Sequence, residues 1–98
     1  MQVIFTPLAE RQLDSLHAYI SASAGESRAD RYVDRIVTYC GSFATFPERG
    51  TRRDDVLPGL RTIGFERRVT IAFMVTPDAV LIEGVFYGWQ DFESAFDD

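Results

Sequence analysis

The sequence predicts an α+β domain in which a helical hairpin packs on a mainly antiparallel sheet, in the order β-α-α-β-β-β with a short C-terminal helical turn. Two observations lead to this prediction. Two successive segments repeat apolar residues with the spacing of amphipathic helices, and a later segment alternates apolar and polar residues as a half-buried strand does. At 98 residues, the chain has room for one domain, which we place at residues 1–98.

The N-terminal segment is expected to form a strand followed by a helix. Gln2–Phe5 is a short apolar run that fits a strand. Thr6 is a suitable N-cap after it, and Pro7 fits the first helical position. Apolar residues at i, i+4, i+7 and i+11 then predict a helix near 8–24, and Gly25 supplies the left-handed residue that ends it.

A second helix is expected near 27–45, because the same apolar spacing is repeated there. Ser27 and Asp30 resemble a capping box at its start, and Pro47 follows its end. The polar segment Glu48–Gly59 is interpreted as a loop. The two helices would form an antiparallel hairpin. Six residues are expected to pack this hairpin on the sheet: Leu13, Leu16, Ile20, Val33, Ile36 and Phe43.

The C-terminal half is expected to form the sheet. Leu60–Phe65 is a short strand, Glu66-Arg67 is a hairpin turn, and Val69–Val75 alternates strongly. Val80–Phe86 is the last strand, and Asp91–Phe96 forms one helical turn.

The charge distribution argues against a broad nucleic-acid interface. The chain has ten Arg, no Lys and fifteen acidic residues, for a net charge of −5. Arginines concentrate in residues 47–68. From Val69 onward, all the charged residues are acidic. Proteins that contact many phosphates are usually basic. We interpret Arg49, Arg52 and Arg53, which lie among acids, as a neutralised surface loop.

Several other classes find no support in the sequence. No apolar run is long enough to span a membrane, and no signal peptide is evident. The single Cys40 cannot form an internal disulfide, and no Cys/His cluster has metal-ligand spacing. The sequence therefore predicts a cytoplasmic protein without a metal or cofactor, and Cys40 is expected to be a small buried residue.

Three segments resemble the ParE branch of the ParE/RelE toxin superfamily. VIFTPLAERQLDSLHAYI resembles the family's first strand and helix, and FPERGTRRDDVLPGLRTIGF resembles its helix exit and second strand. LIEGVFYGWQDFESAF is similar to the ParE-type ending. Family members commonly carry an Arg where Trp89 or Gln90 stands here.

This resemblance implies the toxin of a type II toxin–antitoxin pair, which binds DNA gyrase and is neutralised by a ParD-like antitoxin. DNA would be contacted only indirectly, through the antitoxin. A RelE-type relative would instead cut mRNA on the ribosome, and a third alternative is a non-toxic relative that still binds its antitoxin. The net acidity and the absence of Lys favour the gyrase-binding alternative over the ribonuclease.

An RNA-cleaving site would need a general base, a general acid and cations. His17 is interpreted as a helix-flank residue, because no acid or nucleophile pattern accompanies it. Tyr87 occupies the place of a RelE-type aromatic acid/base, and Arg61 and Arg68 on adjacent strands could activate it. We expect packing or binding there, and no catalytic residue.

The antitoxin surface is expected where arginines and exposed aromatic residues gather. Arg61 and Arg68 flank one hairpin and suit carboxylates of an acidic antitoxin tail. Tyr19 and Tyr32 lie on shoulders of the two helices, where partly exposed aromatic rings can anchor a partner. The predicted antitoxin-binding set is Tyr19, Tyr32, Arg61, Arg68, Phe73, Phe86 and Trp89. The alternative is packing in or beside the core for the aromatic residues and ordinary surface charge for the two arginines.

Overall fold

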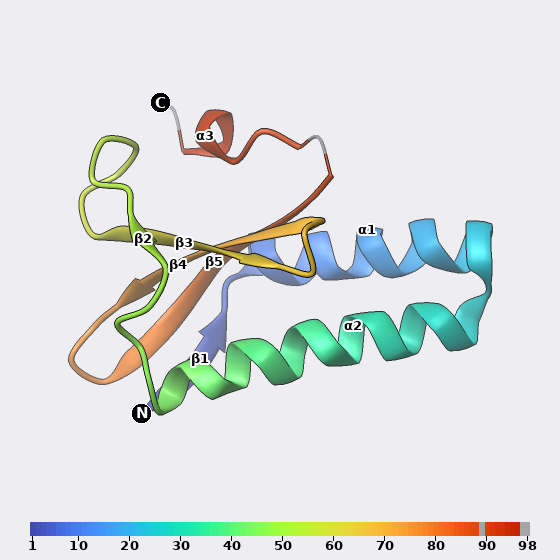
Figure 1. Ribbon diagram of the computed structural model, residues 1–98, viewed down its shortest axis with the longest axis horizontal. Coiled ribbons are helices and arrows are strands. Elements are labelled where there is room, and N and C mark those ends of the chain that lie inside the picture. The colour runs from blue at the N-terminus through green and yellow to red at the C-terminus, as the bar shows by residue number, and fades with distance from the viewer. Residues whose placement is uncertain (89, 97–98) are drawn as a thin grey trace.

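The computed structural model describes residues 1–88 and 90–96, and it has two main layers (Figure 1). A helical hairpin covers one face of a five-stranded sheet. The hairpin consists of α1 (Pro7–Ala24) and α2 (Glu26–Gly41), followed by a 3-10 turn, η1 (Ser42–Ala44). The remaining elements are β1 (Gln2–Phe5), β2 (Thr51–Arg52), β3 (Leu60–Phe65), β4 (Val69–Val75), β5 (Ala79–Tyr87) and α3 (Phe92–Ala95).

The sheet has the order β1-β5-β4-β3-β2 and is mainly antiparallel, as predicted. Only β1 pairs in parallel, with its Gln2 opposite Ala79 and its Phe5 opposite Ile82 of β5. Parallel neighbours need a long crossover, and the chain between β1 and β5 supplies it. The first and last strands therefore lie side by side.

The core between the hairpin and the sheet confirms the predicted helix stripes. Leu13, Leu16, Ile36 and Phe43 are buried, while Ile20 and Val33 are partly buried against them. On the sheet side, the largest fully buried residues of this core are Phe73, Ile71, Ile82, Val80 and Val85. All six predicted hairpin residues thus pack as expected.

The two helix starts differ in how well the sequence predicted them. Thr6 caps α1, since its Oγ1 accepts a hydrogen bond from the Ala9 amide at 3.2 Å. Its hydroxyl also donates to the Glu83 carbonyl at 3.3 Å, which ties α1 to β5. The predicted capping box at Ser27 is wrong. The helix begins at Glu26, because Gly25, with φ of 97°, ends α1 and is also the residue that precedes α2.

The segment Glu48–Gly59 is not entirely a loop, because it contains the short strand β2. Thr51 pairs with Thr62 and Arg52 pairs with Arg61, so β2 forms the edge of the sheet. Two exposed polar residues show no apolar alternation, and so this strand could not be predicted from the sequence.

The second face of the sheet has a smaller cover. Leu60, Ala72 and Phe86 are buried there beneath partly buried side chains from the 53–60 segment and the C-terminal turn. Phe92 and Phe96 of that turn each have their ring centroid 6.2 Å from that of Phe86. The predicted C-terminal helical turn is therefore present as α3, on the side of the sheet opposite the hairpin (Figure 1).

No helix in the described part of the chain is both long and apolar enough to cross a bilayer.

We predict that Gly50→Ala destabilises the fold and that Gly41→Ala does not. Gly50 has φ of 75°, and a Cβ there would lie 2.3 Å from the Thr62 carbonyl oxygen, across the β2–β3 pair. Backbone strain of this kind costs about 1–3 kcal/mol, which lowers the Tm of a domain this size by about 4 °C or more. Thermal unfolding followed by circular dichroism measures the change.

Gly41→Ala is the matched control. Gly41 is helical, with φ of −59°, and nothing lies within 4 Å of an added Cβ. Alanine has the higher helix propensity, so this variant should keep or raise the Tm. A Tm for Gly50→Ala equal to that of the unaltered chain would mean that β2 does not restrict Gly50 in solution.

Candidate functional site

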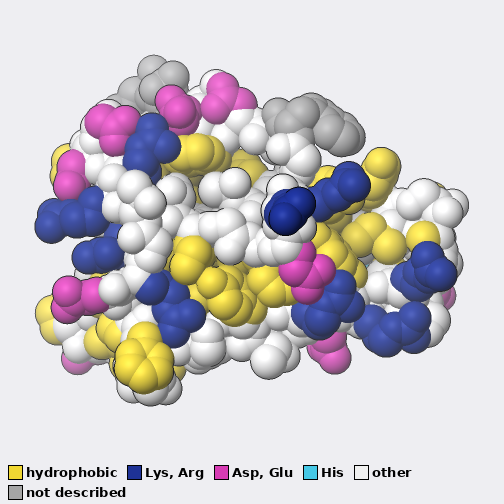
Figure 2. Space-filling model, in the orientation of Figure 1, with side chains coloured by type: hydrophobic (Ala, Val, Ile, Leu, Met, Phe, Trp, Pro, Cys, Tyr) yellow, Lys and Arg dark blue, Asp and Glu magenta, His cyan; other side chains and the backbone are white. Residues whose placement is uncertain are grey.

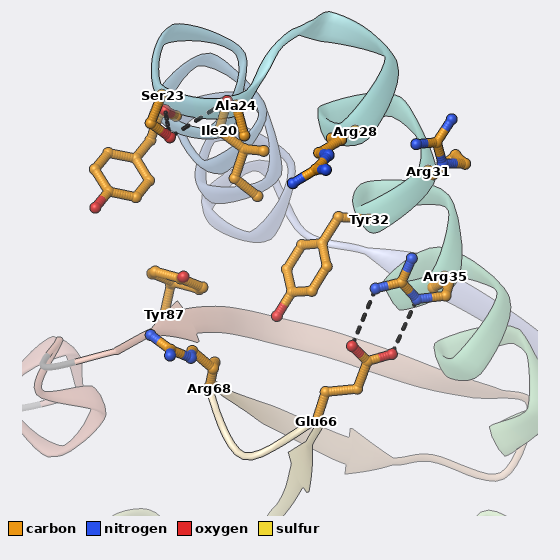
Figure 3. Close-up of a pocket in the computed structure, with 11 residues that line it drawn as sticks. Ile20, Ser23, Ala24, Arg28, Arg31, Tyr32, Arg35, Glu66, Arg68 and Tyr87 are labelled. Carbon is orange, nitrogen blue, oxygen red and sulfur yellow. Dashed lines mark hydrogen bonds and ion pairs between the residues drawn. The ribbon is translucent and has the colours of Figure 1, made fainter.

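One hollow of the protein lies between the Gly25 end of the helical hairpin and the β3–β4 turn (Figure 3). Its volume is about 550 Å³. We call it the Arg–Tyr pocket, because four arginines and three tyrosines line it. The lining residues are Tyr19, Ile20, Ser23, Ala24, Arg28, Arg31, Tyr32, Arg35, Glu66, Arg68 and Tyr87.

The arginines reach the pocket from two elements that are distant in sequence. Arg28, Arg31 and Arg35 have spacings of three and four along α2, which places them on one side of the helix. Arg68 follows the β3–β4 turn. Glu66 and Arg67 at the centre of that turn have φ of 48° and 66°, values that a tight hairpin of this handedness requires. The predicted Glu66-Arg67 turn is therefore correct.

One ion pair connects the two walls of the pocket. Arg35 donates from Nε to Glu66 Oε2 at 2.9 Å and from Nη2 to Oε1 at 3.0 Å. This hydrogen-bonded pair lowers the pKa of Glu66 and raises that of Arg35. Both side chains are about half exposed, with relative areas of 51% and 43%. The pair therefore fixes the distance between α2 and the turn more than it stabilises the fold.

The tyrosines form a connected cluster at the other end of the pocket. The Tyr87 ring lies 5.9 Å from that of Tyr19 and 6.4 Å from that of Tyr32, centroid to centroid. Tyr32 also meets Phe65 edge-on at 6.2 Å, and the Arg35 guanidinium lies 5.1 Å from the Tyr32 centroid. Tyr87 thus packs against the rings of Tyr19 and Tyr32.

The Tyr32 hydroxyl is buried and has no hydrogen-bond partner among residues 1–88 and 90–96. Burial is the main reason that its pKa is raised, and the neighbouring Tyr87 and Glu66 act in the same direction. The hydroxyl is therefore protonated at neutral pH and is a donor without an acceptor. Buried polar groups usually have partners, so this hydroxyl is an unsatisfied donor on a residue that lines the pocket.

The structure brings together only some of the residues predicted to bind the antitoxin. Tyr19, Tyr32 and Arg68 all line the Arg–Tyr pocket. Arg61 lies elsewhere, because it pairs with Phe73, four residues along β3 from the turn. That separation is about 13 Å.

Arg61 contacts a different part of the molecule. Its Nη1 donates to the Arg49 carbonyl at 3.3 Å. Arg61 and Arg68 therefore flank one hairpin, as expected, but at its opposite ends, and the expectation that both could act on Tyr87 is wrong. Strand direction is the physical reason, since Arg61 lies at the β2 end of β3 and Arg68 lies beyond its other end.

Two further predicted residues have little surface to offer a partner. Phe73 is fully buried and Phe86 is 4% exposed. Each can influence antitoxin binding only through the packing of the sheet in this conformation. Trp89 lies outside the described residues.

The sequence reasoning missed Arg28, Arg31, Arg35 and Glu66. For the three arginines, the sequence does contain a pattern that could have indicated them. They are regularly spaced on the side of the second helix away from its apolar stripe. That spacing alone is also typical of a solvated helix face. What it could not reveal is that the β3–β4 turn lies opposite these arginines.

The loop arginines are only partly as predicted. Arg52 and Arg53 pair with neighbouring acids, Asp54 at 3.3 Å and Asp55 at 2.9 Å. Arg49 instead donates to the Phe46 carbonyl at 2.6 Å, and its guanidinium lies 4.8 Å from the Phe43 ring centroid. Arg49 is therefore a packing residue and not part of a neutralised loop.

The other side chains that could act as acids or bases, His17 and Cys40, take part in contacts that hold the fold together. His17 has an acid partner after all, because its Nε2 lies 2.6 Å from Asp30 Oδ1 and so connects α1 to α2. Cys40 is fully buried, and burial raises its pKa to about 12. No group of three potential metal ligands occurs within the described ranges.

Comparisons with known proteins show which family and which solved structure this chain resembles. The model of the family "ParE toxin of type II toxin-antitoxin system, parDE" matches residues 3–92. The fold also matches a solved structure described as "Chromosomal ParDE TA system from P. aeruginosa", with a TM-score of 0.79 and 24% sequence identity, over 90% of this chain and 96% of that chain. The comparison with curated proteins finds no match.

The α+β fold of a helical hairpin on a mainly antiparallel sheet is thus shared with a chain of that solved structure. The family match extends over nearly the whole chain. The chain belongs to the ParE toxin family of type II toxin–antitoxin systems. Membership of this family implies an antitoxin partner.

We predict that Cys40 does not react with iodoacetamide while the protein is folded. A thiolate is the reactive form, and burial both raises the pKa of Cys40 and blocks access to its sulfur. Mass spectrometry after alkylation at pH 8 should show modification only in urea. Rapid alkylation of the native chain would mean that α2 opens away from the sheet.

Proposed function

We propose that this toxin acts by binding DNA gyrase and stalling its cycle, and not by catalysing a reaction. The observation that supports this best is the chemistry around Tyr87. Among the described residues, the lining of its pocket contains no histidine, lysine or cysteine. Glu66 is a weak base, because its hydrogen bonds to Arg35 lower its pKa. General base catalysis works best with a group whose pKa lies near the working pH.

A RelE-type ribonuclease is the second candidate, and one observation favours it. Arg68 lines the same pocket as Tyr87, so a cation is available for the charge of a phosphorane. Arg61 is the other cation that the sequence suggested for this role. It lies about four residues along β3 from the turn that carries Arg68. A non-toxic relative that only binds its antitoxin would use the same surface as a toxic one.

We further propose that a ParD-like antitoxin neutralises this toxin along a groove between α2 and β3. A second hollow of about 660 Å³ lies on this path and shares Arg31, Arg35 and Glu66 with the Arg–Tyr pocket. Tyr39 and Phe65 supply apolar surface in it. Figure 2 shows apolar side chains across this face with arginines on both sides of them.

The predicted contact residues fall at different places along this groove. Tyr19, Tyr32 and Arg68 are at the Arg–Tyr pocket, and Arg61 is toward β2. An acidic, amphipathic antitoxin segment would place apolar residues in the middle and carboxylates at both ends. DNA would then be contacted only through the DNA-binding part of the antitoxin.

We predict that Arg61→Glu and Arg68→Glu each weaken the antitoxin complex about tenfold, because each reverses one end of the charge match. Since the two sites are about 13 Å apart, the losses should be additive in free energy when combined. Isothermal titration at two salt concentrations measures the affinities and their salt dependence.

The control is Arg11→Glu, which changes charge equally at an exposed position of α1 that lines neither hollow. It should have little effect on affinity. If the double variant binds the antitoxin as tightly as the unaltered toxin, the antitoxin occupies another face.

We predict that Tyr87→Phe retains nearly full toxicity. The change removes the hydroxyl that an acid–base mechanism would need, but it keeps the ring that packs against Tyr19 and Tyr32. A catalytic toxin should lose on the order of 10²-fold or more. Survival of cells after induction, compared with Tyr39→Phe as the control, measures potency. Loss of toxicity for Tyr87→Phe alone, together with loss of mRNA cleavage, would replace the gyrase proposal by the ribonuclease.

A further inference from the structure

The Arg–Tyr pocket carries a concentrated positive charge that the protein does not neutralise. The chain as a whole has a net charge of −5, yet four arginines and a single acid line this pocket. Like charges held close together repel, and an anion placed between them relieves that repulsion. An arrangement of this kind is typical of a site for an anion.

The hydrogen bonds of these arginines leave two of them available. Arg35 is engaged by Glu66, and Arg31 donates to Ser27 Oγ at 2.9 Å. Within the described ranges, neither Arg28 nor Arg68 forms a salt bridge or a side-chain hydrogen bond. In Figure 3 these two side chains enter the pocket from opposite walls, Arg28 from α2 and Arg68 from beside Tyr87. An anion between them would meet guanidinium donors from two sides.

A third donor points into the same space. The Tyr32 hydroxyl is buried without a partner in the described part of the chain, and Figure 3 shows it directed between the two walls. A phosphate offers several acceptor oxygens on one centre and can therefore be met from several directions. A carboxylate has only two oxygens in one plane.

The aromatic side chains indicate what carries the phosphate. Tyr19 is 53% exposed at the rim of the pocket, so its side chain is accessible to a ligand there. A volume of about 550 Å³ is within the range of small-ligand pockets, about 300–1,000 Å³. Stacking of a base on an aromatic side chain is a common mode of nucleotide recognition.

We propose that the Arg–Tyr pocket binds a nucleotide through its terminal phosphate. The phosphate oxygens accept hydrogen bonds from Arg28, Arg68 and the Tyr32 hydroxyl, and the base stacks on Tyr19. A free nucleoside monophosphate and the phosphorylated end of a nucleic-acid strand present the same chemistry. This binding does not require that the toxin act on gyrase, so it can be tested separately.

Isothermal titration of the full chain with small probes tests the proposal. The probes are inorganic phosphate, AMP, adenosine, a tetranucleotide with and without a 5′-phosphate, and a glutamate-rich peptide. We expect AMP to bind more tightly than inorganic phosphate, and adenosine and the unphosphorylated tetranucleotide to bind at least tenfold more weakly than their phosphorylated forms. Tighter binding by AMP than by the phosphorylated tetranucleotide identifies a free nucleotide as the ligand, and the reverse order identifies a strand end.

Two variants connect that binding to the named atoms. Arg68→Ala should weaken AMP binding roughly tenfold or more, because a hydrogen bond to a charged group is lost, whereas Arg52→Ala should leave it unchanged. Tyr32→Phe should also weaken it, without lowering the Tm of the free protein, since the hydroxyl it removes has no partner there. A purely structural hydroxyl would give the opposite pattern, with a lower Tm and an unchanged affinity.

The proposal is overturned if no phosphate compound binds at millimolar concentration, or if adenosine binds as tightly as AMP. The glutamate-rich peptide should compete with AMP, because the proposed antitoxin segment also uses Arg68. If AMP keeps its affinity for the Arg68→Ala variant, AMP lies outside this pocket and the proposal is overturned.

Discussion

The packing of the helical hairpin against one face of the sheet is the contact on which the other features of this protein depend. Phe43 and Phe73 meet across it with ring centroids 4.7 Å apart, and Ile36 and Ile82 are fully buried in the same core. Burial of each such side chain contributes about 1.5–3 kcal/mol. An exposed ion pair contributes about 1 kcal/mol or less, so apolar contacts and not surface charges hold the two layers together.

This packing also determines where the candidate site forms. The η1 end of the hairpin lies in the core through Phe43, while the end at Gly25 extends beyond the sheet (Figure 1). The β3–β4 turn stands opposite this overhanging end, and the pair of Arg35 and Glu66 spans the gap. Arginines and tyrosines from three elements and the β3–β4 turn therefore line one hollow without having to be buried in the core. A small domain can keep a charged site in this way at little cost to its stability.

The local parts of the fold could be predicted from the sequence because neighbours along the chain determine them: the two helix stripes, the Thr6 cap and the β3–β4 turn. Features that depend on distant pairing could not. Glu83 interrupts an apolar run, and only the pairing of β4 with β5 shows that it is the extra residue of a β-bulge between the Ala72–Gly84 and Phe73–Ile82 pairs. Likewise, the spacing of arginines on α2 does not reveal the turn that faces them.

Toxicity by binding requires a surface, whereas toxicity by catalysis requires a proton donor and acceptor, and the surroundings of Tyr87 suit the first. The most direct measurement of this claim is a supercoiling assay with purified toxin, DNA gyrase, relaxed plasmid and ATP, run beside a translating extract that contains labelled mRNA. We expect the toxin to block supercoiling and to cause linear DNA to accumulate, while the mRNA stays intact. Normal supercoiling at saturating toxin, with cleavage of the mRNA within its codons, would contradict it.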